Sequence, residues 1–176
     1  KGKGMKIKII KNGTLVTASD IFQADIRIEE DKIALIGTDL DEAGAEVIDA
    51  GGKMIFPGGI DPHVHLDLPM FDTVSSDDHY TGHKAAAFGG TTTVMDFAED
   101  RDSDLLKNLD IWHEMADPKA AIDYGFHLNI TNFNPEIGVQ IPDLVSAGVT
   151  TLKVFTAYNN RLRLQDGEIF QVMRIA

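Results

Sequence analysis

The feature that most constrains this chain is a change of hydrophobic periodicity after Lys53. Beyond that residue, short apolar runs alternate with longer segments of helical periodicity, a pattern typical of β-α units in a parallel sheet. Strands are predicted near 54–57, 60–65, 91–97, 121–130 and 150–156. Helices are predicted near 77–88, near 103–116 behind a candidate N-cap at Ser103, near 136–147, and after Asp166. We therefore expect four β-α units, the last of them incomplete.

The segment before this change has the period-two alternation of short strands joined by tight turns. One predicted strand places Ala24, Ile26 and Ile28 on one face and Asp25, Arg27 and Glu29 on the other. Asn12-Gly13, between apolar runs, is a hairpin signal. Residues 1–54 are predicted to form strands of a small β-sandwich lobe, with residues 1–4 expected to be a tag remnant before a natural start at Met5.

An open parallel sheet of four strands would leave an edge strand and one face uncovered. A (β/α)8 barrel uses eight such units, typically about 250 residues, and carries its chemistry at the carboxyl ends of the strands. The predicted fold class is therefore α/β. Residues 55–176 are expected to be the truncated first half of a (β/α)8 TIM barrel, preceded by the small β-sandwich domain.

Composition excludes several classes of partner. The 16 Lys and Arg residues against 28 Asp and Glu residues give a net charge of -12, which repels phosphate backbones and anionic lipid surfaces. Neither nucleic acid nor membrane is an expected partner. The chain has no cysteine, so a bound metal would need nitrogen and oxygen ligands. With no signal-peptide pattern and no apolar run near the roughly 18 residues of a membrane span, a cytoplasmic location is expected.

The first candidate site is the pair His63 and His65, at the end of the first predicted barrel strand. Period two places both imidazoles on one face, where they could bind one cation. Asp61 shares that face and is a candidate acceptor for an imidazole N–H group. The alternative is that these are ordinary polar residues at a strand end.

The second candidate is Lys153, inside the apolar strand Thr151-Leu-Lys-Val-Phe155. Burying an ammonium group is costly, so this lysine needs a structural reason. One reason is a salt bridge with a barrel carboxylate. The other is that burial lowers the amine pKa, so that the neutral amine reacts with carbon dioxide to give a carbamate that bridges two cations.

Other polar residues are weaker candidates. His79 and His83 share a helix face at a spacing that can bind metal, but they are predicted to be a surface pair. His127 shares a strand face with Asn129, and a core or supporting hydrogen-bonding role is favoured over direct ligation. Asp96, near the end of the second barrel strand, is interpreted in the same way.

Three motifs together resemble the dihydropyrimidinase/D-hydantoinase family of the amidohydrolase superfamily. They are Phe56-Pro-Gly-Gly-Ile-Asp-Pro-His-Val-His-Leu-Asp-Leu-Pro69, Ala87-Phe-Gly-Gly-Thr-Thr-Thr93 and Thr151-Leu-Lys-Val-Phe-Thr-Ala-Tyr158. Asp123-Tyr-Gly-Phe-His127 and the N-terminal strands fit as well. The resemblance covers nearly the whole chain and is to the N-terminal portion of the family.

This resemblance implies a site with two divalent metal ions, with zinc expected and manganese or cobalt left open. His63 and His65 would bind the first ion, and N6-carboxylated Lys153 would bridge both. Tyr158 matches the family's catalytic and substrate-binding tyrosine, which hydrogen-bonds the substrate carbonyl and stabilises the oxyanion. The family's two further histidines and its catalytic aspartate match no position in this chain.

The expected activity is hydrolysis of the ring amide of a small cyclic amide, a dihydropyrimidine or 5-substituted hydantoin, by a metal-bridging hydroxide. The family resemblance also implies a homotetramer. Allantoinase- or dihydroorotase-type enzymes and a non-catalytic dihydropyrimidinase-related scaffold protein remain alternatives. Residues 68–78 and 159–161 differ from the best-known hydantoinases, which leaves the substrate open. The 176-residue chain by itself is expected to be inactive.

Overall fold

The computed structural model describes residues 6–70 and 72–176. The chain divides after Pro57 into two compact units, which are described separately below. The predicted boundary lay three residues earlier, after residue 54. The expected tag remnant at residues 1–4 and the start at Met5 lie outside the described residues.

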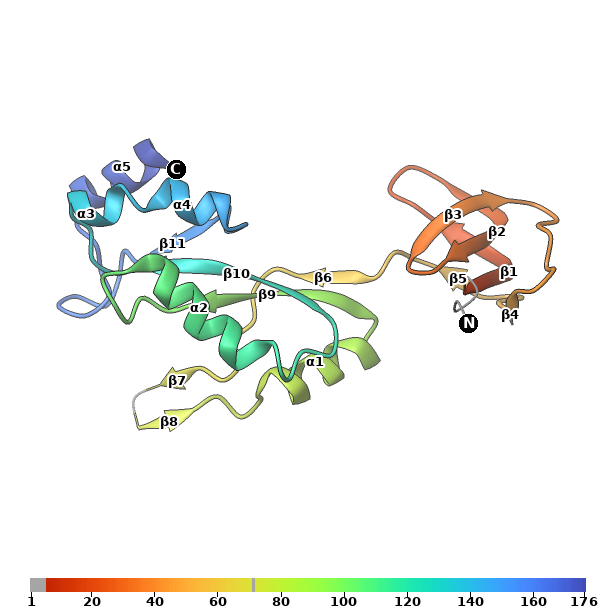
Figure 1. Cartoon of the computed structure of the whole chain (residues 1–176), viewed down its shortest axis with the longest axis horizontal. Helices are drawn as coiled ribbons and strands as arrows, with labels where there is room; N and C mark the ends of the chain where they lie inside the picture. Colours follow the sequence, from red (N-terminus) through yellow and green to blue (C-terminus); the bar gives the residue numbers. More distant parts are fainter. Residues whose placement is uncertain (1–5, 71) are drawn as a thin grey trace, which may run out of the picture. The chain divides into compact units, whose positions relative to one another are not determined.

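The first unit is a mixed five-stranded sheet in the order β3-β2-β1-β4, with β5 also paired to β1 (Figure 1). Strands β1, β2 and β3 pair antiparallel, whereas β4 and β5 run parallel to β1. Leu15, Ala24 and Ile26 form its buried core cluster. The predicted β strands are found, but the described residues of this unit form one sheet, so the two-layered β-sandwich stays a prediction. The strands are β1 (Ile7–Val16), β2 (Ile21–Glu29), β3 (Lys32–Gly37), β4 (Glu46–Asp49) and β5 (Met54–Ile55).

The hairpin predicted at Asn12-Gly13 is wrong, because these residues form a bulge inside the single strand β1. Asn12 has a φ of 61°, and the pairing register with β2 shifts between Ile10 and Gly13. A bulge removes a backbone N–H from the ladder, and here the Asn12 N–H donates to Asp25 Oδ1 at 3.0 Å. The Asp25 side chain is only 7% exposed, although it lies on the strand face opposite Ala24 and Ile26, and this hydrogen bond gives its buried carboxylate a partner.

The second unit is built on a four-stranded parallel sheet in the order β11-β10-β9-β6. Helices follow the strands, and a two-stranded hairpin lies between β6 and α1 (Figure 1). This succession of parallel strands and helical connections agrees with the predicted first part of a (β/α)8 barrel. The strands are β6 (Gly59–Asp61), β7 (Pro69–Met70), β8 (Thr73–Val74), β9 (Thr91–Ala98), β10 (Asp123–Ile130) and β11 (Leu152–Val154). The helices are α1 (His79–Phe88), α2 (Leu105–Ala116), α3 (Pro135–Gly138), α4 (Ile141–Ser146) and α5 (Asp166–Ile175).

The main core lies between this sheet and its helices. Its largest buried side chains come from α2, α4 and the helix-facing positions of β10, and they include Leu105, Trp112, Phe126, Leu128, Ile130, Ile141 and Leu144. The opposite face carries the alternate residues of the same strands. In the strand register His127 pairs with Phe97, and Asn129 pairs with Lys153. Polar side chains are thereby gathered on the sheet face that points away from the helices.

Several predicted element bounds differ from the structure, and three of the differences change the interpretation of a residue or helix. The first barrel strand ends at Asp61, so His63 and His65 lie in the following loop. The N-cap of α2 is Asp104, not Ser103, because the Asp104 side chain accepts the Lys107 N–H. The helix predicted over 136–147 is divided into α3 and α4, and Pro142 near the start of α4 has no N–H with which to continue the preceding helix.

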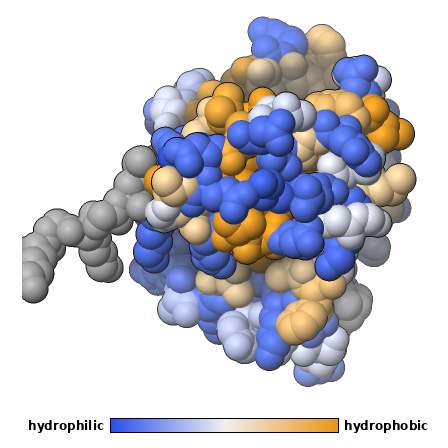
Figure 2. Space-filling model, turned by 90° about the vertical axis from the view of Figure 1, so that its right-hand side faces the viewer, coloured by the Kyte–Doolittle hydropathy of each residue, from blue (hydrophilic) through white to orange (hydrophobic). Residues whose placement is uncertain are grey.

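On the face drawn in Figure 2, hydrophilic and hydrophobic residues are interleaved. Within the described ranges, no helix is both long enough and apolar enough to cross a membrane.

Candidate active site

The imidazoles of His63 and His65 converge after β6. Their Nε2 atoms are 3.3 Å apart, and their ring planes meet at 83°. The loop backbone is held in place, since the His63 N–H donates to Asp61 Oδ1 and the Val64 N–H donates to the Met95 carbonyl oxygen, both at 3.1 Å. Asp61 therefore supports the backbone, and among the described residues the imidazole contact expected for its carboxylate is not found. Two convergent ring nitrogens can act as ligands of one cation.

The phenyl ring of Phe97 lies at the centre of this site and contacts each of its nitrogen-bearing side chains. Its centroid lies 4.5 Å from that of His63, 4.9 Å from that of His65 and 4.8 Å from that of His127. The Lys153 Nζ atom lies 4.0 Å from the same centroid. Phe97 is 5% exposed and follows Asp96 near the end of β9. Sequence reasoning missed it, although strand alternation places Phe97 on the face opposite Asp96.

Lys153 lies in β11 beside the site, and burial lowers the pKa of its amine. Among the described residues, no carboxylate forms an ion pair with Lys153, so the predicted salt bridge is not found there. Burial, together with the positive charge of Lys153, also lowers the pKa of His65. Both shifts favour neutral nitrogen atoms with free lone pairs.

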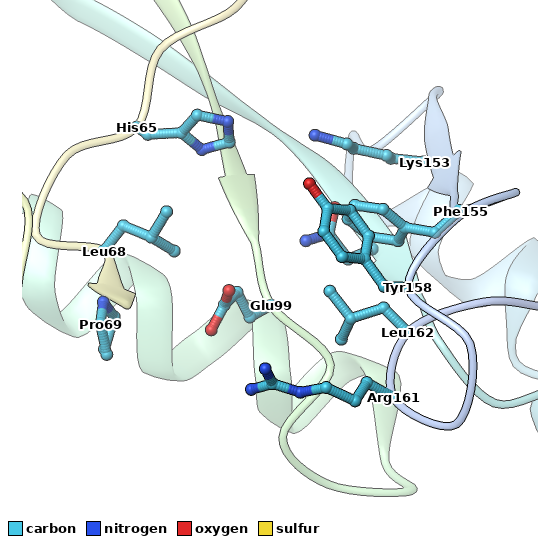
Figure 3. Close-up of a pocket in the computed structure, with 10 residues that line it drawn as sticks. His65, Leu68, Pro69, Glu99, Lys153, Phe155, Tyr158, Arg161 and Leu162 are labelled. Atoms are coloured by element: carbon cyan, nitrogen blue, oxygen red, sulfur yellow. The ribbon is translucent and has the colours of Figure 1, made fainter. Parts of the chain in front are cut away.

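A cavity of about 400 Å³ opens beside these groups. Figure 3 shows the Tyr158 hydroxyl on the side of the cavity where the His65 ring and the Lys153 amine lie. Tyr158 has a φ of 66°, and its carbonyl oxygen accepts the N–H groups of Arg161 and Leu162 in the turn that follows. The cavity is lined by His65, Leu68, Pro69, Glu99, Asn129, Lys153, Phe155, Tyr158, Arg161 and Leu162.

The donor groups fit part of a metal site. The described residues contain no group of three or more His, Cys, Asp and Glu side chains arranged to hold an ion. The set therefore depends on Lys153, whose neutral amine can become a carboxylate-like ligand only after carbamate formation. Beside it in the register, the buried Asn129 Oδ1 has no hydrogen-bond partner within the described ranges. A polar ligand in the cavity would satisfy this oxygen.

His127 supports the same loop from β10. Its Nε2 atom lies 2.9 Å from the Pro62 carbonyl oxygen, and its Nδ1 atom is hydrogen-bonded to Thr151 Oγ1. These contacts agree with the hydrogen-bonding role predicted for His127. Because Pro62 directly precedes His63, His127 helps to place the first imidazole.

The surface position predicted for His79 and His83 is wrong, because both side chains are fully buried. Their face of α1 packs toward β10, where the centroid of the Tyr124 ring lies 6.4 Å from that of His79 and 6.0 Å from that of His83. Polar partners make the burial possible: His79 Nδ1 is 2.7 Å from Asp67 Oδ2, and His83 Nδ1 accepts the Ala121 N–H at 3.2 Å. Helical spacing alone did not predict these partners, which come from other elements.

The parallel β-α units and the cavity at the carboxyl ends of their strands define the class of this chain, the first part of a (β/α)8-barrel protein with an enzyme-like pocket. Comparison with known proteins narrows the class. No family model matches. The chain is 49% identical over 168 residues to D-hydantoinase from Geobacillus stearothermophilus, covering 94% of this chain and 36% of that protein. It is 37% identical over 169 residues to dihydropyrimidinase 2 from Caenorhabditis elegans, covering 94% of this chain and 32% of that protein.

Among solved structures, the dihydropyrimidinase from Brevibacillus agri NCHU1002 superposes with a TM-score of 0.93 at 48% identity, over 96% of this chain and 37% of that chain. The chain belongs to the dihydropyrimidinase/D-hydantoinase family and corresponds to the N-terminal portion of its members. It spans about a third of the length of the curated relatives it matches.

Proposed function

We propose that the full-length protein containing this chain is a metal-dependent hydrolase that opens the ring amide of dihydropyrimidines or 5-substituted hydantoins. The observation that carries the proposal is the convergence of His63, His65 and Lys153 around one buried phenyl ring beside a cavity. The names of the relatives support the substrate class, because they are D-hydantoinases and dihydropyrimidinases.

In this proposal His63, His65 and N6-carboxylated Lys153 hold two divalent ions, with zinc expected. When bound, such ions act as Lewis acids and lower the pKa of water from 15.7 to about 7. Carbamate formation joins the Lys153 nitrogen to the carbon of carbon dioxide and releases a proton from the amine. The neutral amine is the reactive form, and the lowered pKa of Lys153 favours it.

Tyr158 has the role of hydrogen-bond donor. Its phenol O–H would donate to the substrate carbonyl oxygen, on which negative charge develops as the amide is attacked. Leu68 and Leu162 contribute apolar wall to the cavity. Such a wall excludes water from the reacting amide and packs against the ring substituent, so that the few polar groups determine its orientation.

The alternatives make different predictions. An allantoinase- or dihydroorotase-type enzyme would share the metal ligands but prefer another ring. A dihydropyrimidinase-related scaffold protein would bind no metal, and the convergent donor set argues against it. The homotetramer implied by the family resemblance and the cytoplasmic location expected from the sequence are further parts of the proposal.

The test uses the full-length protein and its Lys153→Ala variant, with metal content and hydrolysis as readouts. Lys84→Ala removes an exposed lysine of α1 and is the matched control. We expect wild type and Lys84→Ala to bind metal and to hydrolyse dihydrouracil or hydantoin faster than allantoin or dihydroorotate. Lys153→Ala should lose metal and activity. Unchanged metal content and hydrolysis in Lys153→Ala would overturn the assignment, and preference for allantoin or dihydroorotate would favour the enzyme alternatives.

A further inference from the structure

The loop that carries His63 and His65 is also held at its far end. The Leu66 N–H donates to Asp96 Oδ2 at 3.1 Å, and the Asp67 N–H donates to the Asp77 carbonyl oxygen at 3.0 Å. The Leu66 side chain is 7% exposed and packs beside Gly82 of α1, where an added Cβ would lie 2.4 Å from Leu66 Cδ2. The backbone directly after His65 is thus fixed by polar and apolar contacts.

Asp96 is an unusual acceptor for this bond, because its carboxylate is 1% exposed. Its Oδ1 atom accepts the Phe97 N–H at 2.7 Å, and its Oδ2 atom lies 3.4 Å from His79 Nε2. A buried carboxylate is costly unless it is paired or hydrogen-bonded. Two backbone N–H groups donate hydrogen bonds to the Asp96 carboxylate, and the His79 imidazole lies at ion-pair distance from it without a hydrogen bond of good geometry.

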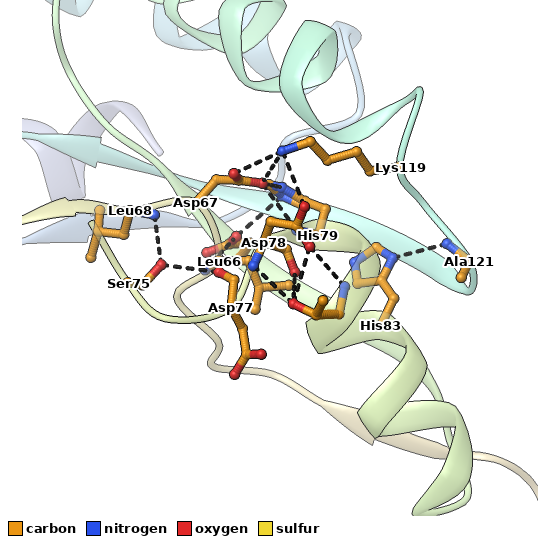
Figure 4. A network of polar contacts seen from close by, with 12 residues as sticks. Leu66, Asp67, Leu68, Ser75, Asp77, Asp78, His79, His83, Lys119 and Ala121 are labelled. Carbon is orange, nitrogen blue, oxygen red and sulfur yellow. Dashed lines mark hydrogen bonds and ion pairs between the residues drawn. The ribbon is translucent and has the colours of Figure 1, made fainter. Parts of the chain in front are cut away.

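The same imidazole reaches a second carboxylate, that of Asp67. His79 Nδ1 lies 2.7 Å from Asp67 Oδ2, and the His79 backbone N–H donates to the same oxygen at 3.0 Å. Lys119 Nζ lies 2.8 Å from Asp67 Oδ1 and 3.0 Å from its Oδ2 atom (Figure 4). Asp67 has a φ of 49°, so the chain turns at this residue. His79 therefore lies between two carboxylates. One is that of Asp96, which accepts the Leu66 N–H, and the other is that of the next loop residue, Asp67.

We propose that Asp96 and His79 are positioning residues of the metal centre, which fix the backbone at Leu66 and Asp67 and thereby direct the imidazoles of His63 and His65 toward a common ion. The proposal rests on the metal-binding role inferred above. Neither Asp96 nor His79 is proposed as a metal ligand. Asp96 positions the histidines through the backbone after His65, and His79 does so through its contacts with Asp96 and Asp67. Outer groups of this kind commonly alter metal affinity by about 10–100-fold.

The experiment compares Asp96→Ala with Asn108→Ala in the full-length protein. Asn108 is an apt control because it is equally buried, and its Oδ1 atom accepts the backbone N–H groups of Arg101 and Asp102 in a different loop. Zinc affinity is measured by titration against a competing chelator, and amide hydrogen exchange over 62–67 is measured in the metal-free proteins. Asp96→Asn, which keeps an oxygen acceptor for the Leu66 N–H, is the conservative variant.

We expect Asp96→Ala to bind zinc at least about tenfold more weakly than Asn108→Ala and to exchange faster over 62–67. Asp96→Asn should restore most of both properties. If Asp96→Ala does not fold, His79→Phe takes its place, because it removes both imidazole nitrogens and leaves the Asp96 carboxylate. Equal zinc affinity and equal exchange in the test and control variants would overturn the proposal. A wild type that binds none of zinc, manganese and cobalt would refute the proposed function and the metal-centre role together. Amide exchange over 62–67 would still show whether Asp96 holds the loop.

Discussion

The amine nitrogen of Lys153 lies 4.0 Å from the centroid of the Phe97 ring, in a site where burial lowers the pKa of that amine. A lysine above an aromatic ring normally gains from the contact as a cation. Burial lowers the pKa of this amine, so its neutral form is more accessible than in water. Lys153 is therefore suited to react with carbon dioxide.

The first prediction concerns carbon dioxide. Metal-free full-length protein should take up zinc faster and more completely in buffer with bicarbonate than in buffer depleted of carbon dioxide, because the carbamate oxygens are part of the binding site. Lys153→Gln, which has no amine, should show no such difference. Uptake is followed by metal analysis after gel filtration. Identical uptake by wild type in the two buffers would contradict the carbamate.

The second prediction separates catalysis from metal binding. Tyr158→Phe removes only the phenol oxygen, so metal content should stay at the wild-type value. The value of kcat for ring-amide hydrolysis should fall by about 10²–10³, the typical effect of losing one donor to an oxyanion. Steady-state kinetics and metal analysis on the same preparation test this. A wild-type kcat in Tyr158→Phe would remove this residue from the mechanism.

The third prediction is a pH dependence of stability that His79 creates. Burial by itself lowers the pKa of His79, but the carboxylates of Asp96 and Asp67 outweigh this effect, and the net pKa is raised. A group whose pKa is raised by folding contributes its full stabilisation when the pH lies below its unfolded-state pKa, about 6.5 for histidine. This contribution disappears as the pH rises through the folded-state pKa.

The Tm advantage of full-length wild type over His79→Gln should therefore be larger at about pH 5.5 than at about pH 9. The pKa of Asp67 is lowered from its ordinary value of 3.8, so the stabilisation that its carboxylate contributes is present at both pH values and does not account for the difference between them. Thermal unfolding at the two pH values provides the measurement. An advantage that grows with pH would show that the sign is wrong.

The fourth prediction tests the bulge of β1. A Cβ at Gly13 would lie 2.2 Å from Ile55 Cδ1, so Gly13→Ala should lower the free energy of unfolding by about 1–3 kcal/mol, as overpacking does. Ile55→Val removes that Cδ1 atom, and the double variant should recover part of the loss. Urea unfolding of the four full-length proteins tests the pair. If the two effects simply add, the clash is not the cause.

Much of the fold was predictable because its signals are local. Alternation at period two or at helical spacing predicted the β lobe and the successive β-α units that the structure shows. The His-x-His spacing and a lysine within an apolar strand also marked three residues that the fold brings to one phenyl ring, His63, His65 and Lys153. Their roles as metal ligands stay predictions.

The errors arose where a residue's environment comes from distant parts of the chain. Asn12-Gly13 has the composition of a hairpin turn, but pairing on both sides of β1 and the Asp25 acceptor make it a bulge. His79 and His83 have a spacing compatible with a surface, but α1 turns them toward β10.

The sequence by itself determined which segments become strands and helices and which side chains carry chemistry, because periodicity and motif are properties of neighbouring residues. Only the tertiary structure decided that Phe97 lies beneath Lys153, that burial lowers the pKa of this amine, and that Asp96 and His79 hold the loop after His65. Desolvation and hydrogen bonding act over a few ångströms between groups that can be tens of residues apart in sequence, so their result is fixed only when the chain has folded.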